Sequence, residues 1–245
     1  MGAGQGNAQP VHMVKLDHFF LDRQEVTNEA FAQFVKGAKN KVQGAWTKAF
    51  GSEQASHPVS SVTHADAQRY CETQDKRLPT EAEWEKATGA SLAKRRYPWG
   101  DEISAGNAQY DGQGTKPVGS LSSGVSPYGV EDLAGNVWEW TADWYGQPYD
   151  TASSTANPQG PAGGLSKVVR GGGWSLSAKA LLATHRAALL PTVSHDYQPG
   201  FGWYVATPTP GAGHLSSHHS SRPAYDIHTG TFAVVLWLLG ERRST

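Results

Sequence analysis

The sequence predicts an α+β fold made of a few helices, short strands and long ordered loops. Three helix-start patterns occur before Gly89, whereas turn signals and short aromatic or β-branched runs predominate after it. The composition favours the same class, because glycine (28), tryptophan (9) and tyrosine (9) are abundant and only 18% of residues are charged. Such a composition is typical of irregular segments held in place by large aromatic side chains.

A short strand is expected over residues 17–23, and three helices follow it. The first helix is expected over residues 26–35, and the others begin near residues 63 and 80. Each start has a threonine whose hydroxyl can accept a hydrogen bond from the first turn. The last two also have an acidic residue three positions later, which is the capping-box pattern. These residues are Thr27, Thr63 with Asp66, and Thr80 with Glu83.

Composition also excludes several classes of protein. The 21 basic and 22 acidic side chains leave a net charge of −1, so no basic field is available for nucleic acid. Cys71 is the only cysteine, which excludes an intrachain disulfide and a thiolate-pair metal site. No apolar run reaches the length of a membrane span, and no signal-peptide core is present. We therefore expect a soluble protein, in a compartment that the sequence leaves open.

Seven motifs occur in order along the chain: EVTNEAF, HPVSSVTHADAQRYC, KRLPTEAEWEKA, YPWGDE, SPYGVEDLAGNVWEWTADWY, NPQGP and VVRGGGW. Together they resemble the formylglycine-generating-enzyme, or sulfatase-modifying-factor, domain family. Its relatives include ergothioneine-pathway sulfoxide synthases and the variable proteins of diversity-generating retroelements. The resemblance covers residues 12–201 and implies a C-type-lectin-like α+β fold.

The two ends of the chain depart from the family pattern. Residues 1–11 are interpreted as a truncated or disordered N-terminus. The family closes with a GFR strand, whereas this chain continues from Phe201 as FGWYVATPTP. We hypothesise that residues 202–245 are a frameshifted tail. The tail's histidines, although spaced like metal ligands, are therefore not assigned to a metal site: His214, His218, His219 and His228.

The resemblance implies a calcium site in the motif DLAGNVWE. Carboxylate and carbonyl oxygens are the ligands that Ca²⁺ prefers. The implied side-chain ligands are Asp132 and Glu139, and the implied carbonyl ligands are Leu133, Gly135 and Val137. The alternative is that Asn136 and Glu139 only satisfy backbone groups in a tight turn. A second implied calcium site includes Asn107, in a loop near Ala108 and Asp111.

Oxidation chemistry is not supported by the residues present. The family's formylglycine-forming members hold copper with two cysteines, whose positions correspond here to Leu176 and Leu181. Leucine can neither ionise nor coordinate a metal. His185 and His195 lack a third ligand, and the helical domain that supplies iron-binding histidines in sulfoxide synthases is absent from this sequence. We therefore expect Ca²⁺ but neither iron nor copper.

A binding surface is expected around the glycine run and the segment after it. The resemblance places matching segments on the ligand face, and small polar residues with an aromatic suit adaptable recognition. The predicted ligand-binding residues are Ser175, Leu176, Ser177, Lys179, His185, Thr192, Ser194, His195, Asp196 and Tyr197. Leu181 and Leu182 are interpreted as core. Trp174, Arg170 and Arg186 are assigned to the framework, with Glu81, Glu83 and Asp143 as acidic partners for the arginines.

Two functions remain open on these grounds. The leading hypothesis is a calcium-stabilised module that binds a protein or small-molecule ligand, without a redox centre of its own. The rival is a non-haem iron or copper oxygenase-type enzyme of the same family, complete only with a missing partner domain. Stoichiometric iron or copper would distinguish the two.

Overall fold

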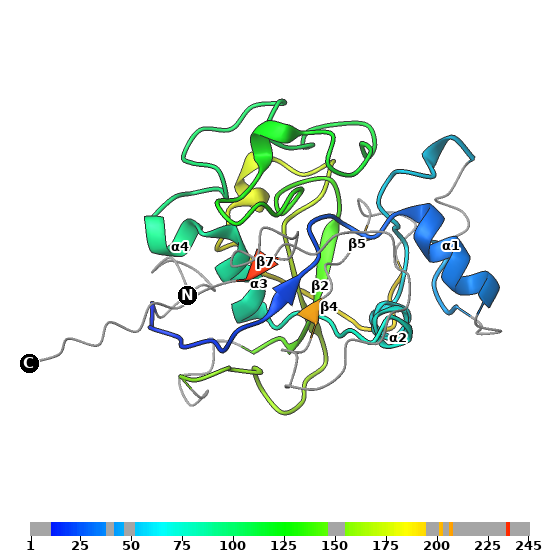
Figure 1. Ribbon diagram of the computed structural model, residues 1–245, viewed down its shortest axis with the longest axis horizontal. Coiled ribbons are helices and arrows are strands. Elements are labelled where there is room, and N and C mark those ends of the chain that lie inside the picture. Colours follow the sequence, from blue (N-terminus) through cyan, green and yellow to red (C-terminus); the bar gives the residue numbers. More distant parts are fainter. Residues whose placement is uncertain are drawn as a thin grey trace, which may run out of the picture.

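The computed structural model describes residues 11–37, 42–46, 52–146 and 155–194, together with short strands at 201–202, 206–207 and 234–235 (Figure 1). Its α-helices are α1 (Asn28–Gly37), α2 (His64–Thr73), α3 (Glu81–Thr88) and α4 (Ala90–Ala93). Its 3-10 turns are η3 (Ser52–Gln54), η4 (Ser122–Gly124) and η5 (Ala178–Leu181). Its strands are β1 (Phe20–Leu21), β2 (Trp138–Trp144), β3 (Lys167–Arg170), β4 (Ala187–Leu189), β5 (Phe201–Gly202), β6 (Ala206–Thr207) and β7 (Val234–Val235). The α+β class is confirmed.

Both predicted capping boxes are present. The Thr63 hydroxyl accepts from the backbone of Asp66 at the start of α2, and the Asp66 carboxylate accepts from the backbone of Thr63. Thr80 and Glu83 make the same reciprocal pair at the start of α3. Each box satisfies two backbone N–H groups that a helix start leaves without a partner, which explains why these helices begin where they do.

The first predicted helix and strand have different limits in the structure. The helical pattern was expected from residue 26, but helix α1 begins at Asn28, because Thr27 is its N-cap, as predicted, and the Thr27 hydroxyl accepts from Ala30 N at 3.2 Å. The expected strand over 17–23 is reduced to the two residues of β1. Its neighbours bind other segments: Asp17 N donates to Asn157, and Asp22 binds Lys76.

The main sheet has the strand order β4-β3-β2-β5. Strand β3 is antiparallel to both β2 and β4, and β5 joins parallel to β2. Glu139 in β2 stands opposite Arg170 in β3. Because β2 and β3 are antiparallel, the loop before β2 lies beside the glycine run that follows β3. The sheet thereby brings the predicted calcium loop next to the predicted binding segment.

Two clusters of buried side chains hold the helices to the strands. In one, Phe31 of α1 and Cys71 of α2 pack with Trp140 of β2. In the other, Leu21 of β1 packs with Trp84 of α3. Both tryptophans are fully buried, and Cys71 is buried as a small apolar side chain.

Part of the chain lies outside the described residues, including residues 1–10 and the tail histidines. The interpretation of the tail as a frameshifted segment stays a prediction. Within the described ranges, no helix is both long enough and apolar enough to cross a membrane.

Candidate functional site

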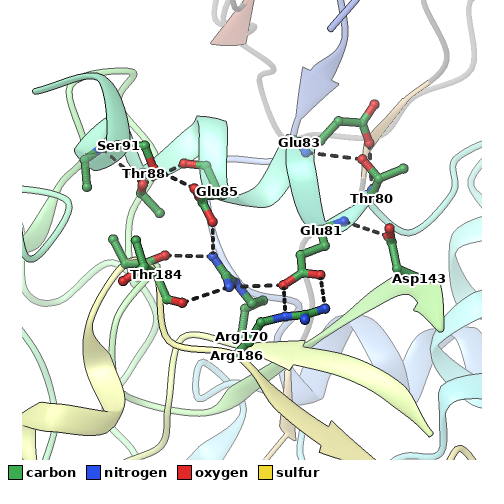
Figure 2. Close-up of polar contacts among 12 residues, drawn as sticks. Thr80, Glu81, Glu83, Glu85, Thr88, Ser91, Asp143, Arg170, Thr184 and Arg186 are labelled. Atoms are coloured by element: carbon green, nitrogen blue, oxygen red, sulfur yellow. Dashed lines mark hydrogen bonds and ion pairs between the residues drawn. The ribbon is translucent and has the colours of Figure 1, made fainter. Parts of the chain in front are cut away.

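A buried ion-pair network joins α3 to β3 and to the chain that follows (Figure 2). Arg170 donates to Glu81 Oε1 at 3.1 Å and to Glu85 Oε2 at 2.9 Å. Arg186 donates to both oxygens of Glu81, at 2.8 and 2.7 Å. These four side chains are at most 3% exposed. Because every charge has an opposite partner, the network offsets the cost of burial and fixes both ends of residues 170–186.

Two of the three acidic residues expected to pair with these arginines have other roles. Glu83 binds Arg77 instead, at 2.6 and 2.7 Å. Asp143 Oδ2 accepts from the backbone N of Glu81 at 2.7 Å and so satisfies the start of α3. Glu85, which sequence reasoning missed, takes the place of Glu83. The available signal was its spacing, because residues four apart share one face of a helix.

The predicted binding segment exposes three polar side chains. Ser175, Ser177 and Lys179 are exposed, and Leu176 between them is half-buried. We call residues 175–179 the recognition strip. Its alternating exposure presents polar groups to solvent while anchoring the intervening leucine.

The other predicted ligand-binding residues differ in how far they are exposed to solvent. Thr192 is exposed, whereas Ser194 is half-buried and accepts from Ala45 N at 3.3 Å. The ring of half-buried His185 lies 5.9 Å from that of Trp138, centroid to centroid. Burial, with a smaller contribution from an arginine nearby, lowers the pKa of His185, so a neutral imidazole is favoured. His195, Asp196 and Tyr197 lie outside the described residues.

Backbone hydrogen bonds hold the recognition strip in place. Trp174 N donates to Asn136 O at 2.8 Å, and Trp174 O accepts from Gly112 N at 2.7 Å. Leu176 O accepts from Asp111 N at 3.0 Å. The Trp174 side chain is half-buried, so its framework role is carried largely by the main chain. Surface side chains on a fixed backbone are typical of binding sites.

The two leucines at the implied cysteine positions pack into one apolar cluster. Leu181 is 1% exposed and packs with Tyr97, and Leu176 and Leu182 are half-buried against the same cluster. A Cβ at Gly172 would lie 2.8 Å from Leu181 Cδ1, so this glycine of the RGGGW motif allows the strip to fold back closely. Leu181 is a core residue, as predicted. Leu182, predicted to be core as well, is half-buried at the edge of the cluster.

The segment from Asp132 to Glu139, which we call the cation loop, leads into β2. Three of its residues have a left-handed backbone: Asp132 (φ 56°), Gly135 (φ 87°) and Asn136 (φ 59°). Gly, Asn and Asp are the residue types that adopt this conformation most readily. The loop therefore turns sharply at the start and in the middle of the motif DLAGNVWE, before β2 begins.

Three buried carboxylates gather at the cation loop. Glu25, Asp132 and Glu139 are 0%, 8% and 0% exposed. Asp132 Oδ2 accepts from Gly119 N at 2.5 Å, and Glu139 Oε2 accepts from the indole N–H of Trp84. Glu139 Oε1 has no hydrogen-bond partner. A buried carboxylate oxygen without a donor is unusual in proteins and suits a metal ligand.

Burial makes the charged forms of these carboxyl groups costly. Burial raises the pKa of Asp132 to about 6, and burial raises the pKa of Glu139 well above its usual value. The pKa of Glu25 is raised by burial and then by repulsion from the other two carboxylates. A bound divalent cation would offset both the desolvation and the repulsion.

The alternative role, in which Asn136 and Glu139 only satisfy backbone groups, applies to one of them. Asn136 Oδ1 accepts from Lys116 N at 2.9 Å, and its Nδ2 donates to Lys116 O at 3.2 Å. Glu139 binds an indole rather than the backbone. Among the described residues, no three His, Cys, Asp or Glu side chains group as a metal site. A cation here would therefore depend on the implied carbonyls of Leu133, Gly135 and Val137.

Asn107 already uses both ends of its side-chain amide. Its Oδ1 accepts from the backbone N and the hydroxyl of Ser104, at 3.0 and 2.7 Å, and its Nδ2 donates to Ser123 O at 2.8 Å. A calcium ion at Asn107 would have to compete with the Ser104 donors. This second site stays a prediction.

Sequence reasoning also missed Glu25, which lies in the EVTNEAF motif beside the buried Val26. Its contacts are with Asn136, at a sequence separation of 111 residues. No local pattern indicates such a contact, because helix-cap and strand periodicities reach only a few residues.

Comparison with known proteins places the chain among its relatives. Residues 1–201 match the Sulfatase-modifying factor enzyme 1-like domain. A formylglycine-generating enzyme of Streptomyces coelicolor is 34% identical over 222 residues, covering 67% of this chain and 70% of that protein. The serine/threonine-protein kinase pkn1 of Chlamydia caviae is 37% identical over 201 residues, covering 75% of this chain but 32% of the kinase. The chain thus spans about a third of the kinase's length.

Solved structures share the fold. PvdO from Pseudomonas aeruginosa superposes with a TM-score of 0.67 at 23% identity, covering 82% of this chain and 85% of that one. Treponema denticola variable protein 1 gives a TM-score of 0.64 at 24% identity, covering 84% and 90% of the two chains. The family resemblance and the C-type-lectin-like fold expected from the seven motifs are confirmed. The chain belongs to the sulfatase-modifying factor enzyme 1-like family.

Proposed function

We propose that this chain is a calcium-stabilised ligand-binding or accessory module that has no redox centre of its own. The recognition strip carries this proposal. Ser175, Ser177 and Lys179 are exposed on a hydrogen-bonded backbone, whereas Leu176 and Leu181 occupy the positions implied for copper-binding cysteines. Leucine supplies no metal ligand, so the strip retains a surface for recognition without the copper ligands.

The proposal of an accessory module is supported by the short part of a longer relative that this chain matches. A protein named as a serine/threonine kinase matches this chain over about a third of its own length, which suits a module joined to other domains. The ligand would be a protein or a small molecule, because small polar side chains on a fixed scaffold favour adaptable hydrogen bonding. The shared fold with a Treponema variable protein is compatible with this role.

The calcium part of the proposal is supported by the cation loop. Its buried Glu139 has one oxygen without a donor, and Asp132 lies in the same loop. Two carboxylates and the implied carbonyls supply oxygen ligands of the type that Ca²⁺ takes. When bound, the ion would neutralise the buried negative charge and fasten the loop that anchors Trp174.

The rival function is a metal-dependent oxidoreductase of the same family that depends on a partner domain for iron or copper. The 34% identity to a protein named formylglycine-generating enzyme favours it. It requires redox-metal ligands other than the side chains of Leu176 and Leu181.

Metal analysis and oxygen uptake separate the two functions. We expect purified protein to contain no stoichiometric iron or copper and to consume no oxygen with a cysteine-containing peptide after copper is added. Stoichiometric redox metal with thiol-dependent oxygen uptake would overturn the leading proposal. In parallel, glycan and peptide arrays are probed with the wild type and with a triple alanine variant at Ser175, Ser177 and Lys179. We expect signals that the triple variant loses; signals that it retains would place binding elsewhere.

A further inference from the structure

We propose that Glu25 is a positioning residue for the calcium ion of the cation loop, acting through Asn136 and Val137 without touching the ion. The inference rests on the proposed function, and it assigns a role to a residue in the chain before α1. Its support lies in the hydrogen bonds of Glu25, in the peptide planes that they hold, and in the charge around Glu25.

Each oxygen of the Glu25 carboxylate accepts a hydrogen bond from the cation loop. Oε2 accepts from Asn136 Nδ2 at 2.7 Å, and Oε1 accepts from Val137 N at 3.4 Å. The orientation of the Asn136 amide is determined by its other contact, because Lys116 N is a donor and requires Oδ1 beside it. Nδ2 therefore faces Glu25. A group that must accept at both atoms is a carboxylate rather than an amide.

These contacts hold one peptide plane of the loop from both sides. In a trans peptide, the C=O and the N–H point in opposite directions. Between Asn136 and Val137, the C=O accepts from Trp174 N at 2.8 Å while the N–H donates to Glu25. The plane therefore cannot turn without breaking one of these bonds. The carbonyls of Gly135 and Val137, which are the implied calcium ligands, flank this plane.

The peptide before it is held in a similar way. Asn136 N donates to Gln109 O at 2.9 Å, so the Gly135 carbonyl in the same peptide points away from Gln109. Asn136 adopts a left-handed backbone, which asparagine tolerates better than most residues. Its side chain is held by Lys116 and by Glu25, the latter from a segment 111 residues away in sequence.

The charge of Glu25 also links this residue to a calcium ion at the cation loop. Within the described ranges, no lysine, arginine or histidine forms an ion pair with Glu25, Asp132 or Glu139. Arg170 acts on Glu139 through space without an ion pair, but among the described residues no cationic side chain shifts the pKa of Glu25 or Asp132. A fully buried carboxylate beside others opposes folding unless positive charge is nearby. A calcium ion at the loop would attract all three. Glu25 therefore contributes more to the calcium-bound protein than to the calcium-free protein.

The test is the Glu25→Gln variant, which keeps the size of the side chain but replaces one acceptor oxygen with a donor and removes the charge. Calcium chloride is titrated into chelator-treated protein by calorimetry, and melting temperatures are measured in chelator and in excess calcium. We expect calcium affinity to fall by about 10- to 100-fold, as is usual for residues behind metal ligands. We also expect the calcium-induced rise in melting temperature to shrink. Unchanged affinity and an equal rise would overturn the proposal.

Three further variants make the result decisive. Glu29→Gln makes the same chemical change at an exposed position of α1 and should bind calcium as the wild type does. Glu25→Asp keeps the charge, but its shorter side chain moves the carboxylate oxygens away from Asn136 and Val137, so weaker calcium binding is expected for this variant too. Glu25→Asp also serves as the test if Glu25→Gln does not fold. Glu139→Gln tests the loop itself. If Glu139→Gln weakens calcium binding and both Glu25 variants bind normally, only the present inference fails. If the wild type binds no calcium, the proposed calcium site fails with it.

Discussion

Arg186 donates hydrogen bonds to both carboxylate oxygens of Glu81, at 2.8 and 2.7 Å, in a site where neither side chain is more than 3% exposed. Arg170 binds one of the same oxygens. One acidic residue of α3 therefore binds both arginines that flank the recognition strip, and Glu85 supplies the second negative charge by binding Arg170 (Figure 2).

Glu81→Gln should destabilise the protein by about 3–5 kcal/mol, because removal of one partner leaves buried charge without compensation. Urea denaturation measures the free energy of unfolding. Glu29→Gln, an exposed change on α1, should stay within about 0.5 kcal/mol of the wild type. Similar unfolding midpoints for the two variants would contradict the assigned role of Glu81.

Trp84→Ala and Trp174→Ala should differ in stability. Trp84 is 0% exposed, so Trp84→Ala should lower the free energy of unfolding by about 3–5 kcal/mol. Trp174 is half-buried, so its truncation removes less packing and leaves its backbone bonds intact. Thermal unfolding of both variants under one condition makes the comparison. A larger loss at Trp174 would show that its side chain, rather than its main chain, supports the strip.

The pH dependence of stability should contain a contribution from Asp143. Burial, followed by repulsion from Glu81, raises the pKa of this carboxyl to about 7, above the unfolded value of about 3.9. The folded state therefore holds this proton more tightly. The resulting stability is present below the unfolded pKa and is lost as pH rises through about 7.

Asp143→Asn cannot ionise, yet its amide oxygen can still accept from Glu81 N. We expect the variant to lose less stability than the wild type between about pH 4 and pH 8, as measured by urea denaturation in chelator. The chelator keeps the calcium content equal in the two proteins. Parallel pH profiles would show that Asp143 is ionised throughout this range.

Calcium should stabilise the wild type but not Glu139→Gln. At a calcium concentration of about 100 times the dissociation constant, one site adds about 2.7 kcal/mol to the free energy of unfolding. Glu139 supplies a buried oxygen that has no other partner, so its replacement should abolish most of this gain. Differential scanning calorimetry of both proteins, with and without chelator, measures the calcium-induced change in melting temperature. No calcium shift in the wild type would remove Asp132 and Glu139 as ligands.

Local contacts were predictable, and distant contacts only in part: Glu81 was correctly named as a partner of the two arginines, but Glu85 was missed. The capping boxes at Thr63 and Thr80 involve residues three positions apart, so the residue types alone indicate them. The pairing of Arg170 with Glu85 spans 85 residues, and sequence reasoning chose Glu83 instead. Glu85 shares one face of α3 with Glu81, which lies four positions before it, whereas Glu83 lies on another face. Packing against β3 decides which face meets the arginines.

The chemistry that the chain lacks was determined by the sequence itself. A single cysteine, with leucine at positions 176 and 181, supplies no thiolate pair, whatever the fold. Tertiary structure alone decided that Glu25, Asp132 and Glu139 lie buried near one another, and that Ser175, Ser177 and Lys179 face solvent. The physical reason is that donor atoms belong to residue types, whereas exposure and electrostatic coupling depend on which distant segments come together.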